Sequence, residues 1–299
     1  MDSITTQILD VKYYEPEVQR VLLASTHGLR NAVNNKGVIV GSSVRFPITD
    51  IDGISNVVSK GSPINPDDLM ADVKNVTIES FESSTKVFPQ DLAATNSAAS
   101  IRANAALKVV HAMENRFTQC ILDALAQYDD TNMEIGSSSD KFTTSSLDEV
   151  NLLADNHGWG NGDKYILLPA EAKYTLMQDS KFYEIWSLVN GQRFRDGIKS
   201  SDDSMQIEWT PYRGFNVGFL PKAGRNIVGL PTAADTSLMG YAWKASRVGF
   251  AMNSAMESRI FEDKTKEGNP IVFKTNGSCG AGIIDTEGVI GIKIDPSVS

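Results

Sequence analysis

The sequence of 299 residues has few cysteines and few histidines, two and three respectively. Cys120 and Cys279 are too few for the disulfide framework that holds small secreted proteins together, and such sparse use is typical of a reducing cytoplasm. The histidines leave little material for a metal site, because bound metal ions usually need three or four protein ligands. We therefore expect no disulfide framework and no metal.

Long hydrophobic runs and an excess of basic residues are also absent. No apolar stretch approaches the ~20 residues that a membrane-spanning helix requires. The first residues, Met-Asp-Ser-Ile-Thr-Thr-Gln, lack the basic and apolar regions of a secretory signal. The net charge is −9, whereas sequence-specific DNA-binding proteins usually present a basic surface. We expect a soluble protein made in the cytoplasm, without membrane contact and without sequence-specific binding to DNA.

Catalytic motifs are missing too. The Gly-x-Ser-x-Gly motif of serine hydrolases does not occur. Gly158–Lys164 is glycine-rich like a phosphate-binding loop, but a predicted helix precedes it and a predicted strand follows, which is the reverse of the required order. His111 and Glu114 lie one helical turn apart, as metal ligands can, but further ligands are lacking. We predict no catalytic residue, no cofactor and no enzymatic activity, with a hydrolase or ligand-binding α/β protein as a remaining alternative.

The strongest positive signal is an amphipathic helix from Ile101 to Tyr128. Apolar residues recur there every three to four positions, which is the period of a helix with one buried stripe. The stripe consists of Ile101, Ala105, Val109, Ala112, Met113, Phe117, Cys120, Ile121, Ala124, Leu125 and Tyr128. At 1.5 Å per residue the helix is about 40 Å long, well beyond the average of about 11 or 12 residues. Either an ordinary core helix or a structural spine fits this pattern.

Two strand-like runs precede the helix, around Val38–Ile48 and Val73–Phe81. The segment between them, Thr49–Asp72, is rich in turn residues. An isolated two-stranded hairpin is only marginally stable in water. We therefore expect this long hairpin to depend on a partner surface.

The rest of the chain predicts a mixed arrangement of helices and strands. A capping box at Ser146–Glu149 opens a helix, and Pro169 begins another. We predict strands at Lys164–Leu168, Phe215–Leu220, Ile227–Leu230, Ile271–Phe273 and Val289–Ile294, with a hairpin turn at Asp285–Gly288 before the last. Tyr241–Met252 is a further strand or a buried segment. The predicted fold class is α+β.

In this order, the segments resemble the major capsid proteins of tailed phages with the Hong Kong 97 fold, most closely those of short-tailed phages. The resemblance covers nearly the whole chain and is carried by several short segments. These are Gln19–Leu23, Leu29–Val33, Val76–Phe81, Ala105–Leu107, Ala112–Phe117, Ile121–Leu125, Lys164–Glu171, Gly214–Pro221, Ser278–Asp285 and Val289–Ile292.

The resemblance implies four structural parts. Residues 1–36 would form an N-terminal arm and residues 37–88 an extended β-hairpin loop. Residues 89–160 and 253–299 would form a peripheral domain around the spine helix. Residues 161–252 would form a mixed α/β axial domain. In this arrangement the extended loop would lie over a neighbouring subunit, which supplies the partner surface that the hairpin requires.

The resemblance also implies a function. The chain would self-assemble into hexamers and pentamers of an icosahedral shell that encloses double-stranded DNA, with scaffold and portal proteins as further partners. It would be made in the host cytoplasm and become part of the virion. Because fold alone does not fix use, an encapsulin-like protein compartment is the alternative.

Six residues are the predicted contacts between subunits. Arg45, Phe46, Asp52 and Lys60 lie in the extended loop. Arg193 and Arg195 belong to Gly191–Gly197, a predicted surface loop and the best local basic patch, which would face DNA or a neighbour's carboxylates.

Overall fold

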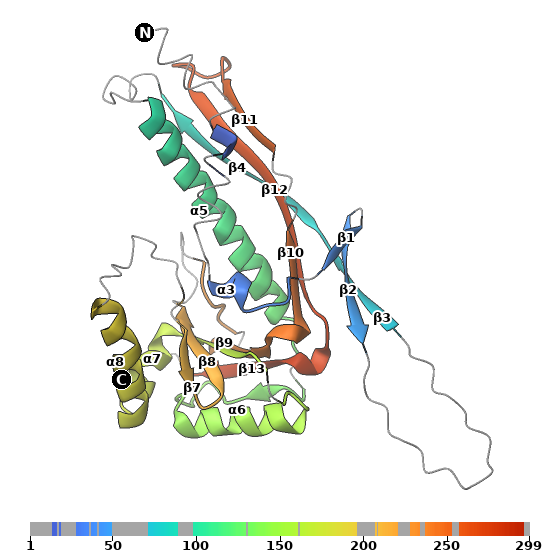
Figure 1. Ribbon diagram of the computed structural model, residues 1–299, viewed down its shortest axis with the longest axis vertical. Helices are drawn as coiled ribbons and strands as arrows, with labels where there is room; N and C mark the ends of the chain where they lie inside the picture. The colour runs from blue at the N-terminus through green and yellow to red at the C-terminus, as the bar shows by residue number, and fades with distance from the viewer. Residues whose placement is uncertain are drawn as a thin grey trace, which may run out of the picture.

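The longest helix, α5 (Ala98–Leu125), lies along one face of a four-stranded antiparallel sheet in the computed structural model (Figure 1). The central strand of this sheet is β12 (Ile271–Ile283). One edge of β12 pairs with β4 (Glu79–Val87), and the other pairs first with β11 (Glu257–Glu262) and then with β10 (Val248–Met252). The structure describes residues 14–16, 18, 28–35, 37–40, 42–49, 71–88, 98–129, 131–160, 162–195, 207, 209–220, 228–233, 237–252 and 257–295.

The predicted apolar stripe of the long helix is largely confirmed. Ile101, Ala105, Val109, Met113, Phe117, Ile121, Ala124 and Leu125 are buried. Ala112 is exposed, and its prediction was wrong, because it lies about 100° around the helix from Met113 and falls outside the stripe. Glu114 is buried instead.

A second sheet of six strands lies beyond the end of α5 (Figure 1). Its strand order is β5–β13–β9–β6–β8–β7, with parallel pairing between β5 and β13 and between β6 and β8. The strands are β5 (Glu134–Ile135), β6 (Lys164–Pro169), β7 (Thr210–Tyr212), β8 (Phe215–Leu220), β9 (Leu238–Lys244) and β13 (Val289–Ile294). The helices that pack against this sheet are α6 (Thr144–Asn156), α7 (Ala170–Leu176) and α8 (Ser180–Arg195). The strands predicted near 164, 215 and 289 are therefore confirmed.

The six-stranded sheet is buried on both faces. Along β9, Met239, Tyr241 and Trp243 join the core around α5, while Leu238 and Ala242 join a second core that includes residues of α6, α7 and α8. This alternation follows from the period of two in a strand. The sheet therefore separates and connects the two cores.

A third, three-stranded sheet contains β1 (Val38–Val40), β2 (Ser43–Thr49) and β3 (Ala71–Thr77) and stands beside the four-stranded sheet (Figure 1). Antiparallel pairing from Ser43↔Thr77 to Thr49↔Ala71 confirms the base of the predicted hairpin. The run predicted as one strand at Val73–Phe81 is two strands that meet at Ile78. β3 pairs with β2 and β4 pairs with β12, so one extended segment serves two sheets.

Other predictions differ from the structure because sheet membership is not visible in local patterns. The predicted strand Tyr241–Met252 is divided between β9 and β10 by the turn η1 (Ala245–Arg247). Asp285–Gly288 is not a hairpin turn, because β12 and β13 lie in different sheets and η2 (Thr286–Gly288) connects them. The predicted boundary at 252/253 falls between β10 and β12, which pair in one sheet. The four-part division of the chain stays a prediction.

Two helix boundaries also differ from the sequence prediction. The capping box of α6 uses Thr143 with Ser146 as its third residue, so the predicted start at Ser146 was three residues late. Residues 191–195, predicted as a surface loop, continue α8.

Candidate functional site

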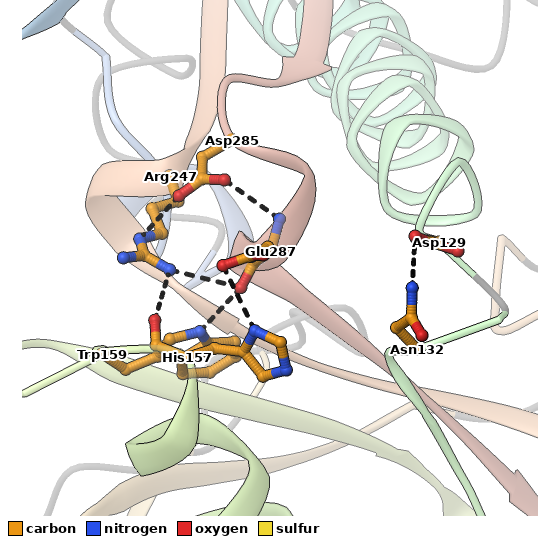
Figure 2. A network of polar contacts seen from close by, with 7 residues as sticks. All are labelled: Asp129, Asn132, His157, Trp159, Arg247, Asp285 and Glu287. Atoms are coloured by element: carbon orange, nitrogen blue, oxygen red, sulfur yellow. Dashed lines mark hydrogen bonds and ion pairs between the residues drawn. The ribbon is translucent and has the colours of Figure 1, made fainter. Parts of the chain in front are cut away.

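The chain passes between the two large sheets at two adjacent turns, η1 and η2 (Figure 2). The backbone N–H of Ile284 donates to the Arg247 carbonyl oxygen over 2.8 Å. The Arg247 guanidinium forms an ion pair with Asp285, with 3.1 Å between Nε and Oδ2. It also donates to the carbonyl oxygens of His157 and Glu287, at 3.1 and 3.3 Å. Arg247 therefore joins three segments at one point.

The loop after α6 completes this junction. Trp159 is fully buried, and its Nε1 donates to the Glu287 carbonyl oxygen over 2.8 Å. His157 Nδ1 lies 3.2 Å from the Glu287 carboxylate, an ion pair when the imidazole is protonated. Gly158 has a φ of +66°, which favours glycine, so the glycine-rich run that resembles a phosphate-binding loop begins at the end of a helix. The arrangement fixes one sheet relative to the other and contains no catalytic geometry.

The turn after α5 has polar contacts of its own, which Figure 2 shows apart from those of the junction. The Asp129 carboxylate accepts from the Thr131 backbone N–H at 3.0 Å and from Asn132 Nδ2 at 3.4 Å. The bond from the Thr131 N–H is the main reason that the pKa of Asp129 lies below its usual value. Asp129 thus fixes the exit from α5 toward β5.

We expect Arg247→Ala to lower the free energy of unfolding by about 1 to 2 kcal/mol, because hydrogen bonds to charged groups typically contribute that much or more. Denaturant unfolding monitored by tryptophan fluorescence would measure the loss. Lys274→Ala is the matched control, since its ion pair with Glu82 joins two partly exposed side chains and should contribute less than about 1 kcal/mol. Equal losses in the two variants would contradict a special role for Arg247.

A short helix, α3 (Gly28–Asn31), attaches the N-terminal segment to α5. Arg30 Nη2 lies 2.5 Å from Glu114 Oε1, and the Glu114 side chain is only 1% exposed. The Arg30 guanidinium also lies over the Phe117 ring, 5.6 Å from its centroid. Trp243 Nε1 donates to the Ala32 carbonyl oxygen over 2.7 Å. The last part of the predicted arm is therefore bound to the spine helix and to the six-stranded sheet.

Sequence reasoning missed this ion pair. It weighed Glu114 only as a metal ligand beside His111, and the structure places His111 on the exposed side of α5. The available signal was a carboxylate between the apolar residues Met113 and Phe117 on the buried face of a helix.

The root of the hairpin is held by a small apolar cluster. Val44 and Phe46 are fully buried with Ala251, against Val76 and Ile78. A Cβ atom at Gly249 would lie 2.5 Å from the Phe46 ring, so only glycine allows the ring to approach β10 this closely. Phe46, a predicted contact between subunits, is thus buried within its own subunit. Arg45, its neighbour on β2, is exposed.

The other predicted contacts are not described at their side chains. Asp52 and Lys60 lie outside the described residues. Arg193 and Arg195 lie in the last turn of α8, where the structure describes the backbone alone. The described residues do not bring these predicted contacts together into one site.

A groove of about 370 Å³ opens where the hairpin root, α5 and β12 meet. Its walls include Lys74 and Glu79 from the hairpin side, Cys120 and Asp123 from α5, and Gly282 from β12. Among the residues that the structure describes, no group of three or more potential ligands is arranged to hold a metal ion. Within the same residues, no helix combines the length and hydropathy needed to cross a membrane.

A spine helix on a four-stranded sheet, a second sheet reached through paired turns, and a projecting hairpin make this an α+β chain of the Hong Kong 97 type, as predicted from the sequence. The solved structures to which the chain is similar include phage heads and capsids and a virus-like particle. No known family profile and no curated protein sequence matches the chain.

The similar structures cover nearly the whole chain at low sequence identity. A chain from the head of Helicobacter pylori bacteriophage KHP40 matches with a TM-score of 0.60 and 15% identity, over 89% of this chain and 88% of that chain. The capsid of Ralstonia phage GP4 matches with a TM-score of 0.61 and 11% identity, over 90% and 89%. A virus-like particle from Pyrococcus furiosus matches with a TM-score of 0.55 and 12% identity, over 94% and 100%. At these identities, the likeness establishes the fold.

Proposed function

We propose that the chain is the major capsid protein of a tailed phage, and that it self-assembles into hexamers and pentamers of an icosahedral shell around double-stranded DNA. One observation carries the proposal: the likeness to the phage KHP40 head protein extends over 89% of this chain and 88% of that one. The likeness thus extends over most of the chain and is not limited to one sheet or one helix. A shell protein functions through the contacts between its subunits, and this role requires no catalytic residue.

The hairpin root supports assembly as the mode of action. Near Phe46 the hairpin is anchored by a cluster of three buried apolar residues in its own subunit. Beyond β1, which pairs with β2 near the root, the hairpin consists of the two strands β2 and β3, and an isolated two-stranded hairpin is marginal in water. A neighbouring subunit supplies that surface in the proposed shell, where interfaces are repeated by symmetry. Arg45, Asp52, Lys60, Arg193 and Arg195 are the proposed contacts at such interfaces or with packaged DNA.

The direct test is the state of the purified protein. We expect closed shells or capsomers when the chain is produced alone or together with an internal scaffold protein, as seen by negative-stain electron microscopy and by sedimentation velocity. A protein that stays monomeric at high concentration, with residues 37–88 packed on its own body, would contradict the proposal.

A protein compartment of the encapsulin type is the second candidate, favoured by the likeness to the Pyrococcus furiosus virus-like particle. Its shells would enclose an enzyme as cargo, whereas phage shells would enclose DNA. Genes for portal and terminase proteins beside this gene would support the phage capsid, and a gene for a cargo enzyme would support the compartment. Portal and scaffold partners, synthesis in a host cytoplasm and a place in the virion belong to the first candidate.

A further inference from the structure

The two cysteines of the chain come from distant parts of the sequence, one on α5 and one on β12. Both are free thiols. Neither takes part in the junction, in the anchor of α3 or in the cluster at the hairpin root. Their relative position follows from the way in which α5 lies on β12.

Cys279 points from β12 toward α5. Two residues earlier, a Cβ atom at Gly277 would lie 3.3 Å from Met113 Cε of α5. Residues two apart in a strand share a face, so Cys279 faces the helix as well. Its side chain is fully buried in the core around α5.

Cys120 presents its thiol to the same place. It follows Met113 by seven residues, about two helical turns, and therefore lies on the same side of α5. It is partly buried and lines the groove beside the hairpin root, next to Ala281 of β12. The Cys120 thiol thus has access to solvent through the groove, whereas the Cys279 thiol is buried beneath the groove.

The two thiols lie on the facing sides of α5 and β12 and pack in the same core. A hydrogen bond from Cys279 is the main reason that the pKa of Cys120 is lowered, and the nearby Arg116 guanidinium acts in the same direction. The same hydrogen bond, together with burial, raises the pKa of Cys279. A thiolate is the nucleophile in disulfide exchange, so Cys120 is the member of the pair that reacts first.

We propose that Cys120 and Cys279 form a reversible disulfide within one subunit under oxidising conditions, which ties the spine helix covalently to the central strand β12. A low-molecular-weight disulfide such as oxidised glutathione is the oxidant. The groove admits it to Cys120, while the buried Cys279 acts as the resolving thiol. A chain made reduced in a cytoplasm would acquire the bond after release into an oxidising environment.

The disulfide forms by two steps of thiol–disulfide exchange. The Cys120 thiolate attacks one sulfur of oxidised glutathione, which forms a mixed disulfide on Cys120 and releases one glutathione thiolate. Cys279 loses its proton to the released thiolate, and its own thiolate attacks the Cys120 sulfur and displaces the second glutathione. Two protein thiols are oxidised, and one glutathione disulfide is reduced to two thiols.

The test uses the full-length wild-type chain at low concentration, incubated with oxidised glutathione and then denatured and alkylated with N-ethylmaleimide. We expect no alkyl group on the oxidised protein by intact-mass measurement, two on a sample treated with dithiothreitol, and one cross-linked peptide that contains both cysteines. The midpoint of thermal unfolding should rise by about 5 to 10 °C on oxidation, because the bond closes a long loop. Dithiothreitol should reverse the rise.

Cys120→Ser is the matched control, since its partly exposed position accepts a hydroxyl at little cost. The variant should show the same unfolding midpoint with and without oxidised glutathione. Two alkylated cysteines after oxidation, a stable glutathione adduct without cross-link, or disulfide-linked dimers in the wild type would each overturn the proposal. These readouts do not require shells, so they are independent of the proposed capsid function.

Discussion

Replacement of Glu114 by alanine should lower the free energy of unfolding by about 3 kcal/mol or more, because removal of one partner of a buried ion pair leaves the other charge uncompensated. The ion pair between Arg30 and Glu114 has the geometry of such a buried pair. Glu114 is 1% exposed and Arg30 is 16% exposed, and their side-chain atoms approach to 2.5 Å. Arg30 would keep its place over the Phe117 ring and lose the Glu114 carboxylate. Urea denaturation of the unassembled protein measures the loss.

Two further variants separate the charge from the packing. The double variant Arg30→Met/Glu114→Leu should recover most of the lost stability, since apolar residues of similar volume often replace a buried ion pair without loss. Arg116 lies on the same helix as Glu114 and forms an exposed pair with Glu79 of β4. Arg116→Ala should cost less than about 1 kcal/mol. If Glu114→Ala were no more costly than Arg116→Ala, the Arg30–Glu114 pair would not be the anchor of α3.

Phe46→Ala should detach the hairpin root from β10 and abolish shell assembly. Removal of a buried phenylalanine side chain typically costs about 3 to 5 kcal/mol. The cluster around Phe46 is small, so the loss should be local. We expect backbone amides of β2 and β3 to exchange hydrogen about 100-fold faster, which corresponds to about 3 kcal/mol, while amides of α5 and β12 stay unchanged. Hydrogen exchange with mass spectrometry measures both.

Arg45→Ala is the matched control, one residue away on the opposite, exposed face of β2. It should leave hydrogen exchange in β2 and β3 within about two-fold of the wild type. A defect in shell assembly without faster exchange would support Arg45 as a contact between subunits. Normal assembly of Arg45→Ala would contradict that prediction, and normal assembly of Phe46→Ala would contradict the need for an anchored hairpin.

Local patterns predicted the elements of this fold well. The buried stripe of α5, the strands at 164, 215 and 289 and the hairpin of β2 and β3 all have periodicities that depend on neighbours in sequence. The order of these elements, through the resemblance to phage capsid proteins, predicted the fold class. Each of these features depends on the residues of one short segment or on the order of the segments along the chain.

Long-range pairing was not predictable in the same way. The strand pattern at Val73–Phe81 is continuous, yet its two halves pair with β2 and β12 because different partners are available at each end. The pattern at Tyr241–Met252 is likewise continuous and contributes to two sheets. The role of Phe46 was also hidden, because its burial depends on Gly249, far along the chain.

The position of β12 in the sequence determines when the four-stranded sheet can form during synthesis. This strand lies between β4 on one edge and β10 and β11 on the other, and β13 is enclosed between β5 and β9. Both strands come after these partners in the sequence, and their contacts with residues near 80 and 134 are highly non-local, which slows folding. During synthesis, the hairpin and α5 emerge long before the strands that hold them. In the proposed shell, a growing chain would therefore offer a finished surface to its neighbours only after β12 and β13 have been made.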